Sequence, residues 1–207
     1  MNNKENEPLI ELLKRKKTKI QLFIDMDGVL ADFDGSDRFQ SYDPYMHSPP
    51  RMYEKGFFEN LKPVDGAIWA TKMLQKSKMY DIHILSKPVK DSPYCYYEKC
   101  AWILKYFPGL EKNMHLSQEK GLLSKEGRIL IDDDINKWKE PWEVNGGDFI
   151  WFSKNAFVYD ETDHDRSYFA PGSNREVWEL IVGHLTGFQT IESHGDFSRN
   201  RIRRIYD

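Results

Sequence analysis

Two aspartates separated by one residue are the first feature of this chain that could do chemistry. Asp25 and Asp27 directly follow the apolar run 20–24, and Gly28 comes next. A carboxylate can act as a nucleophile, as a general acid or base, or as a ligand of a hard cation. Glycine permits the sharp turn that brings backbone close to a ligand. Taken alone, the pattern also fits an acidic turn or a calcium-binding loop.

A hydroxyl, a lysine and an acidic pair each follow a later apolar run. They are Ser86, Lys120 and the pair Asp132 and Asp133. Carboxylates suit Mg²⁺, which binds through one or two of them plus a phosphate, while a lysine and a hydroxyl can neutralise and orient phosphoryl oxygens. Together these groups indicate magnesium-dependent phosphoryl transfer.

The apolar runs predict strands buried on both faces, because they are rich in Ile and Leu and mostly lack alternation. We predict about five strands, over residues 20–24, 82–85, 114–116, 128–131 and 149–152, and helices over 67–79, 94–107 and 174–185. Strands alternating with helices predict right-handed crossovers and a doubly wound, Rossmann-like parallel α/β sheet. Ligands bind at the carboxyl ends of such strands, which is where the polar residues above lie.

One stripe of the predicted helix 94–107 is expected to face the core. It consists of Tyr97, Cys100, Ala101, Leu104 and Phe107. The chain has only two cysteines, Cys95 and Cys100, which excludes a disulfide framework and a four-cysteine zinc site. We expect both thiols to pack rather than to form a redox pair.

Residues 35–63 interrupt the alternation of strands and helices. They are rich in Asp, Ser, Pro and aromatic residues and contain no strand-like run, so we predict a small cap inserted after the first strand. The predicted core then comprises residues 20–34 and 64–190. A helical extension is expected over residues 1–19, and a polar, basic tail over residues 191–207.

The composition excludes several classes of protein. The 207 residues are 40% hydrophobic and 14% aromatic, which is enough to bury a core. The net charge of −3 excludes a globally basic nucleic-acid binder. No apolar run approaches the roughly 20 residues that span a bilayer, and the N-terminus does not resemble a signal peptide. We therefore expect a cytoplasmic protein without membrane or nucleic-acid partners. A homodimer is a candidate assembly.

The ordered strand-end residues resemble the four motifs of haloacid dehalogenase-like phosphatases. Three longer blocks, residues 25–33, 94–102 and 130–133, are more narrowly similar to the 5′(3′)-deoxyribonucleotidase family. Phe57 and Phe58, with the Leu-x-Pro-x-x-Gly-Ala pattern of residues 61–67, resemble that family's return from cap to core. The resemblance covers residues 20 to 155, approximately.

This resemblance implies a mechanism of phosphate-ester hydrolysis. Asp25 would attack the phosphorus of a nucleoside monophosphate and form an aspartyl-phosphate. Asp27 would protonate the leaving oxygen and then activate water. Mg²⁺ would be held by the Asp25 side chain, the Asp27 backbone carbonyl and the Asp133 side chain, with Asp132 as the alternative ligand or a supporting partner.

The resemblance also implies a set of phosphate contacts. Ser86, Lys120 and the backbone amides near Met26 and Asp27 would hold phosphoryl oxygens. Lys87 stands where the family usually has a second small residue, and it would either add a cation near the phosphate or point to solvent.

Phe33 and Phe58 match positions at which family members pack aromatic rings around the nucleobase. Ordinary core packing is the alternative for each ring. The cap looks shorter than that of the animal enzymes, so a phosphatase for another small phosphate ester is a second hypothesis. A non-catalytic binding protein on the same fold is a third.

Overall fold

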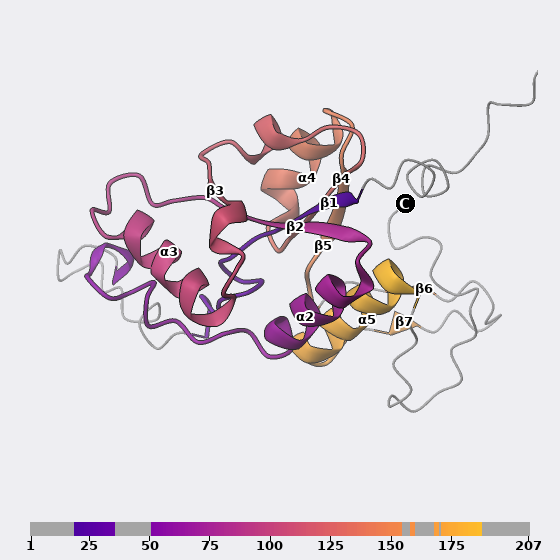
Figure 1. Ribbon diagram of the computed structural model, residues 1–207, viewed down its shortest axis with the longest axis horizontal. Coiled ribbons are helices and arrows are strands. Elements are labelled where there is room, and N and C mark those ends of the chain that lie inside the picture. The colour runs from indigo at the N-terminus through magenta and orange to yellow at the C-terminus, as the bar shows by residue number, and fades with distance from the viewer. Residues whose placement is uncertain (1–18, 36–50, 155–157, 160–167, 170, 188–207) are drawn as a thin grey trace, which may run out of the picture.

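A computed structural model describes residues 19–35, 51–154, 158–159, 168–169 and 171–187 (Figure 1). The predicted N-terminal extension up to residue 18, residues 36–50 of the predicted cap and the predicted tail lie outside the described residues. The domain boundaries therefore stay predictions.

A five-stranded parallel sheet forms the centre of the molecule, with strand order β3-β2-β1-β4-β5. The strands are β1 (Ile20–Ile24), β2 (Tyr80–Ser86), β3 (Met114–Leu116), β4 (Arg128–Asp132) and β5 (Asp148–Trp151). Ile24 of β1 pairs with Ile84 on one side and Ile131 on the other. The predicted parallel sheet is confirmed, and its order brings the carboxyl ends of β2, β1 and β4 side by side.

Helices cover both faces of the sheet, as expected for a doubly wound fold. Helices α2 (Ala67–Ser77), α3 (Cys95–Tyr106) and α5 (Asn174–Thr186) contribute to one core cluster with Leu22 and Ile24. Helix α4 (Ile135–Glu143) covers the other face, where Trp138 and Trp142 pack with Phe23 (Figure 1). Consecutive residues of β1 thus point to opposite faces, and the last three, Leu22 to Ile24, are buried.

Helix α4 is an element that the sequence pattern does not predict. Its only large buried residues are Trp138 and Trp142, four positions apart, and Pro141 lies inside it. Asp134 caps its start, because the carboxylate accepts a hydrogen bond from the Lys137 amide at 3.2 Å. Burial of two tryptophans against the sheet outweighs the proline's poor helix propensity.

Helix α3 buries a face different from the predicted stripe, so that prediction is wrong for all of the stripe except Phe107, which follows the helix and is buried. It exposes Tyr97, Cys100 and Leu104 and buries Cys95, Glu98, Lys99 and Trp102. Hydrophobic periodicity misses this face because two of its residues are charged. The buried polar side chains of α3 all have partners: the Trp102 indole N–H, for example, donates to the Leu61 carbonyl at 2.8 Å.

The remaining described elements are short. They are the 3₁₀ turns η1 (Arg51–Tyr53), η2 (Glu111–Asn113) and η3 (Lys120–Leu123), and an antiparallel pair, β6 (Val158–Tyr159) and β7 (Tyr168–Phe169). The chain that follows β1 is joined to its own return: Asp32 N donates to Lys62 O, and Val64 N donates to Leu30 O, both at 2.8 Å. Within the described part of the chain, none of the helices has the length and apolar character needed to cross a membrane.

Candidate functional site

Three aspartates from adjacent strands meet at the carboxyl edge of the sheet. Asp25 follows β1, Asp132 ends β4, and Asp133 comes next. One carboxylate oxygen from each lies within 4.8 Å of the others. Asp25 is only 5% exposed and Asp132 is fully buried. The crossovers from β1 and from β4 run in opposite directions along the sheet here, which is where open α/β sheets bind ligands.

Burial and mutual repulsion raise the pKa of all three carboxyl groups. Burial is the largest cause for Asp25. Burial, followed by the charge of Asp25, raises the pKa of Asp132 to about 7 and that of Asp133 to about 8. A divalent cation bound among them would relieve this repulsion, and carboxylate oxygens are ligands that hard cations prefer. The cluster therefore fits a metal ion.

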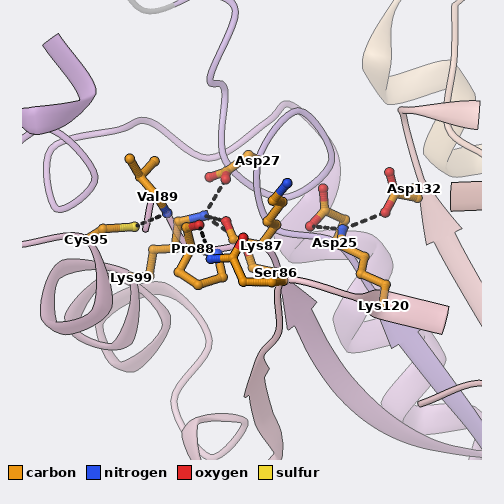
Figure 2. Close-up of polar contacts among 11 residues, drawn as sticks. Asp25, Asp27, Ser86, Lys87, Pro88, Val89, Cys95, Lys99, Lys120 and Asp132 are labelled. Atoms are coloured by element: carbon orange, nitrogen blue, oxygen red, sulfur yellow. Dashed lines mark hydrogen bonds and ion pairs between the residues drawn. The ribbon is translucent and has the colours of Figure 1, made fainter. Parts of the chain in front are cut away.

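Lys120 supplies a positive charge inside this cluster (Figure 2). Its Nζ lies 2.7 Å from Asp25 Oδ1 and 2.6 Å from Asp132 Oδ2, and its side chain is buried. Burial opposes the charge, but the two carboxylates outweigh burial and raise the pKa of Lys120. The second oxygen of Asp132 accepts a hydrogen bond from the Asp134 amide at 3.0 Å. Both carboxylate oxygens of Asp132 thus have protein partners. Asp132 is buried, and Asp133 is more exposed than Asp132.

Gly28 lets the loop after β1 approach Asp133. Its φ is +81°, and a Cβ built there would lie 2.2 Å from Asp133 Oδ2 and 2.7 Å from Cγ. A residue with a side chain at this position would be strained by the left-handed backbone conformation, and its Cβ would also clash with the Asp133 carboxylate. The glycine predicted for a close approach is therefore required by geometry.

Lys99 reaches the second aspartate from helix α3 (Figure 2). Its Nζ forms an ion pair with Asp27 Oδ2 and donates to Ser86 Oγ at 2.8 Å and to the Lys87 carbonyl at 2.9 Å. The other carboxylate oxygen of Asp27, Oδ1, is buried and has no hydrogen-bond partner in the part of the chain that the structure describes. Asp27 thus gives one oxygen to Lys99, while no described residue hydrogen-bonds to the other.

Sequence reasoning missed Lys99 as a site residue. The signal that could have found it is its spacing, because Lys99 lies four residues after Cys95 and three before Trp102, on the same buried stripe. A charged residue in the apolar stripe of an amphipathic helix needs a buried partner. Cys95 has a different role here: burial raises the pKa of its thiol, and Sγ accepts a hydrogen bond from the Val89 amide at 3.2 Å.

A cavity of about 530 Å³ lies over these groups. Seven of the predicted site residues line it: Asp25, Asp27, Phe33, Lys87, Lys120, Asp132 and Asp133. Lys87 faces it from the loop after β2, with its Nζ 5.9 Å from the centre of the Trp138 ring. The structure therefore gathers the predicted acidic groups and both predicted lysines around one space.

Three predicted site residues lie behind the cavity wall rather than on it. Ser86 is fully buried, with its hydroxyl bonded to Lys99, and the Met26 side chain is also fully buried. Phe58 is 1% exposed and stacks behind Phe33, with ring centroids 6.3 Å apart and an interplanar angle of 23°. Phe33 is the member of the predicted aromatic pair that reaches the cavity. Substrate contacts of all these residues stay predictions.

Comparison with known proteins relates the chain to one group of enzymes. It is 33% identical to the mitochondrial 5′(3′)-deoxyribonucleotidase of Homo sapiens and 32% identical to that of Mus musculus, over 55% of this chain in both cases. The aligned part spans only 62% and 64% of those relatives. A protein of Vibrio phage KVP40 named "Putative 5′(3′)-deoxyribonucleotidase" is 35% identical, over 59% of this chain and 71% of its own length.

Neither protein-family models nor solved structures identify the family of this chain. No protein-family model matches the chain. A solved haloacid dehalogenase-like hydrolase from Burkholderia xenovorans LB400, putative by its own description, gives a TM-score of 0.40 at 16% identity, over 64% of this chain and 81% of that one. The phage relative is covered over more than two thirds of its length, and further relatives bear the same enzyme name. By sequence, this chain belongs to the 5′(3′)-deoxyribonucleotidase family.

Proposed function

We propose that this protein is a magnesium-dependent phosphatase that hydrolyses nucleoside monophosphates, 5′(3′)-deoxyribonucleotides above all, through an aspartyl-phosphate. The observation that carries the proposal is the buried Asp25 carboxylate, held by Lys120 within 4.8 Å of the carboxylate oxygens of Asp132 and Asp133. A nucleophile, a cation and metal-ligand candidates meet at one point. The names of the related proteins support the nucleotide as substrate.

The first half of the proposed reaction transfers the phosphoryl group to the protein. An Asp25 carboxylate oxygen attacks phosphorus, and the bond from phosphorus to the ribose oxygen breaks. Asp27 donates a proton to that oxygen through Oδ1, because Lys99 already holds Oδ2. Lys120 lies against Asp25 and offsets negative charge on the phosphoryl oxygens.

The second half restores the protein. A water molecule attacks phosphorus of the aspartyl-phosphate and gives its proton to Asp27, and the bond to the Asp25 oxygen breaks. Inorganic phosphate leaves, and both side chains return to their starting states.

Asp25, the Asp27 backbone carbonyl and Asp133 are the groups we assign to Mg²⁺. Both oxygens of Asp132 are occupied by Lys120 and the Asp134 amide, which favours Asp133 as the direct ligand and Asp132 as the residue that positions Lys120. When bound, Mg²⁺ supplies positive charge that offsets repulsion between a carboxylate nucleophile and a phosphate dianion.

The test is phosphate release from a substrate panel with and without EDTA. Asp25→Asn removes the nucleophile, so we expect no turnover of dUMP or dTMP with Mg²⁺ present. Asp65→Asn, an exposed aspartate just before α2, is the matched control and should keep wild-type rates. Appreciable turnover by Asp25→Asn would overturn the nucleophile assignment.

A second candidate function is hydrolysis of another small phosphate ester. It is favoured by the position of Phe58, because only Phe33 of the predicted aromatic pair lines the cavity. Sugar phosphates and ribonucleotides belong in the same panel for this reason. Equal rates for deoxyribonucleotides and sugar phosphates would favour this second candidate.

We propose the cytoplasm as the protein's location. Both cysteines are free thiols, Cys95 buried and Cys100 exposed, which suits a reducing compartment. Fractionation of cells that express the tagged full chain tests this: recovery with a cytosolic marker is expected, and recovery in an organelle fraction would contradict it.

A further inference from the structure

Glu98 is a buried carboxylate that the proposed reaction does not use. It is 2% exposed, and no lysine or arginine pairs with it among the residues that the structure describes. Its two oxygens accept backbone hydrogen bonds instead, Oε1 from the Gly56 amide at 2.5 Å and Oε2 from the Phe58 amide at 3.0 Å. Carboxylates are rarely buried without such partners, so the two amide hydrogen bonds are what allow Glu98 to be buried here.

The segment that Glu98 holds leads directly to the cavity wall. The Phe58 ring packs edge-on against Phe57, with centroids 4.9 Å apart, and stacks on Phe33. Phe33 lines the cavity, whereas Phe58 does not. Phe33 also packs edge-on against Phe57, with centroids 5.6 Å apart, so the Phe57–Phe58 pair supports Phe33, and Glu98 holds the backbone of Phe58.

The same turn of helix α3 also serves the phosphate end of the site. Lys99 follows Glu98 and contacts Asp27 and Ser86, and its Nζ lies 4.8 Å from the centre of the Phe58 ring. Two neighbouring side chains of one helix thus hold two distant loops, one from the segment after β1 and one from the return at residues 56–58. A rigid helix fixes the spacing between these loops.

We propose that Glu98 is a positioning residue for recognition of the nucleobase: by clamping the amides of Gly56 and Phe58, it seats Phe58 so that Phe33 is held against the base end of the substrate. The inference rests on the proposed nucleotidase function, since it requires a substrate that carries a base. A purely structural role predicts instead that every substrate suffers equally when Glu98 is changed.

Glu98→Gln is the sharpest perturbation, because it keeps the size of the side chain but replaces one acceptor oxygen with an NH₂ group that faces an N–H. Glu176→Gln is the matched control. Glu176 also accepts a hydrogen bond from a backbone amide, that of Gly172 at 2.6 Å, but it lies on α5 and does not line the cavity. Phe58→Leu removes the supporting ring without touching the carboxylate.

The readout is the ratio of kcat/KM for dTMP to that for 2-deoxyribose 5-phosphate, which has the same phosphate and sugar but no base. We expect this ratio to fall about tenfold in Glu98→Gln and in Phe58→Leu, mainly through the KM for dTMP, and to stay unchanged in Glu176→Gln. In the double variant the two losses should not add, because they act through one contact. An unchanged ratio in Glu98→Gln, or additive losses, would overturn the proposal.

Amide hydrogen exchange separates this proposal from the proposed function, because it needs no substrate. In Glu98→Gln we expect faster exchange at Gly56 and Phe58, with the amides of residues 100–106 of α3 still protected. If exchange at Gly56 and Phe58 is unchanged, the claim that Glu98 holds these amides is overturned even if the enzyme is active. If the wild-type protein hydrolyses no nucleotide, the proposed function fails, base recognition fails with it, and the exchange rates still decide whether the clamp exists.

Discussion

Replacing Gly28 with alanine tests the link between the first loop and the metal-ligand candidate Asp133. The added methyl would lie 2.2 Å from Asp133 Oδ2, and contacts of Cβ atoms below 3.0 Å essentially never occur, so the carboxylate must move by at least 3.0 − 2.2 = 0.8 Å. The backbone at φ +81° adds a cost of about 1–2 kcal/mol for any residue with a Cβ.

These two effects have different consequences. The backbone cost lowers the free energy of unfolding, by about 1–2 kcal/mol. A displacement of about 1 Å at a reacting centre can lower the rate by about 100-fold, so we expect a loss of that order in kcat/KM. Because Asp133 is the group displaced, part of the loss should return when the Mg²⁺ concentration is raised.

Gly127→Ala is the control that separates the two effects. Gly127 has φ +78°, but nothing lies within 4 Å of a Cβ built on it. It should show the same loss of stability in urea unfolding and no loss of phosphatase activity. Equal activities for the two variants would refute the argument that Gly28 makes room for Asp133, and an unchanged Mg²⁺ dependence in Gly28→Ala would refute Asp133 as a metal ligand.

Three further predictions concern charge and capping. The folded-state pKa values of Asp132 and Asp133, about 7 and about 8, lie above the ordinary 3.8, so the metal-free protein should lose stability as pH rises from about 4 through 8. Thermal unfolding scans should show that Mg²⁺ abolishes this loss. A metal-free melting temperature that rises over this range would contradict the prediction. Lys120→Met leaves two buried carboxylates without their cation, so urea unfolding should show that the free energy of unfolding falls by about 3–5 kcal/mol. Turnover should be lost as well, and retained turnover would argue against a role of Lys120 at the phosphate. Ser173→Ala removes the side-chain cap of α5, which should cost about 1 kcal/mol in the same unfolding assay and leave activity intact; lost activity would mean that α5 supports the site.

The strands and the acidic residues could be predicted because both depend on local pattern. A central parallel strand is apolar on both faces, so β1 is recognisable from its five residues alone, and the polar residue that ends it must lie at the sheet's carboxyl edge. Once the chain is read as a parallel sheet, Asp25 and Asp132 fall at the same edge. That they are also neighbours depends on the pairing of β1 with β4, which the structure shows and the sequence pattern does not predict.

Helix α3 itself can be predicted from the sequence, but its buried face cannot, because that face is decided by partners distant in sequence. Judged by apolar residues, Tyr97 and Leu104 look like core positions, yet they are 72% and 57% exposed. Lys99 can be buried only because Asp27 and Ser86 lie opposite, and Glu98 only because two amides of the return segment point at it. Such long-range pairing leaves no periodic signal in the sequence of the helix.

The charge balance of the site explains why two lysines and a metal ion belong to it together. Four carboxylates, those of Asp25, Asp27, Asp132 and Asp133, face two buried ammonium groups, those of Lys99 and Lys120, so the net charge is −4 + 2 = −2 when all groups are ionised. Without a metal, bound protons relieve this charge, because burial first and repulsion between the carboxylates second raise the pKa values of the acidic cluster. A divalent cation carries the charge needed to replace those protons, and it leaves the Asp25 carboxylate ionised and able to attack. Lys87 also lines the cavity but is outside this count of six groups. Without Lys99 the six groups would carry −3, so Lys99, which sequence reasoning missed, keeps their charge at the −2 that one divalent ion balances.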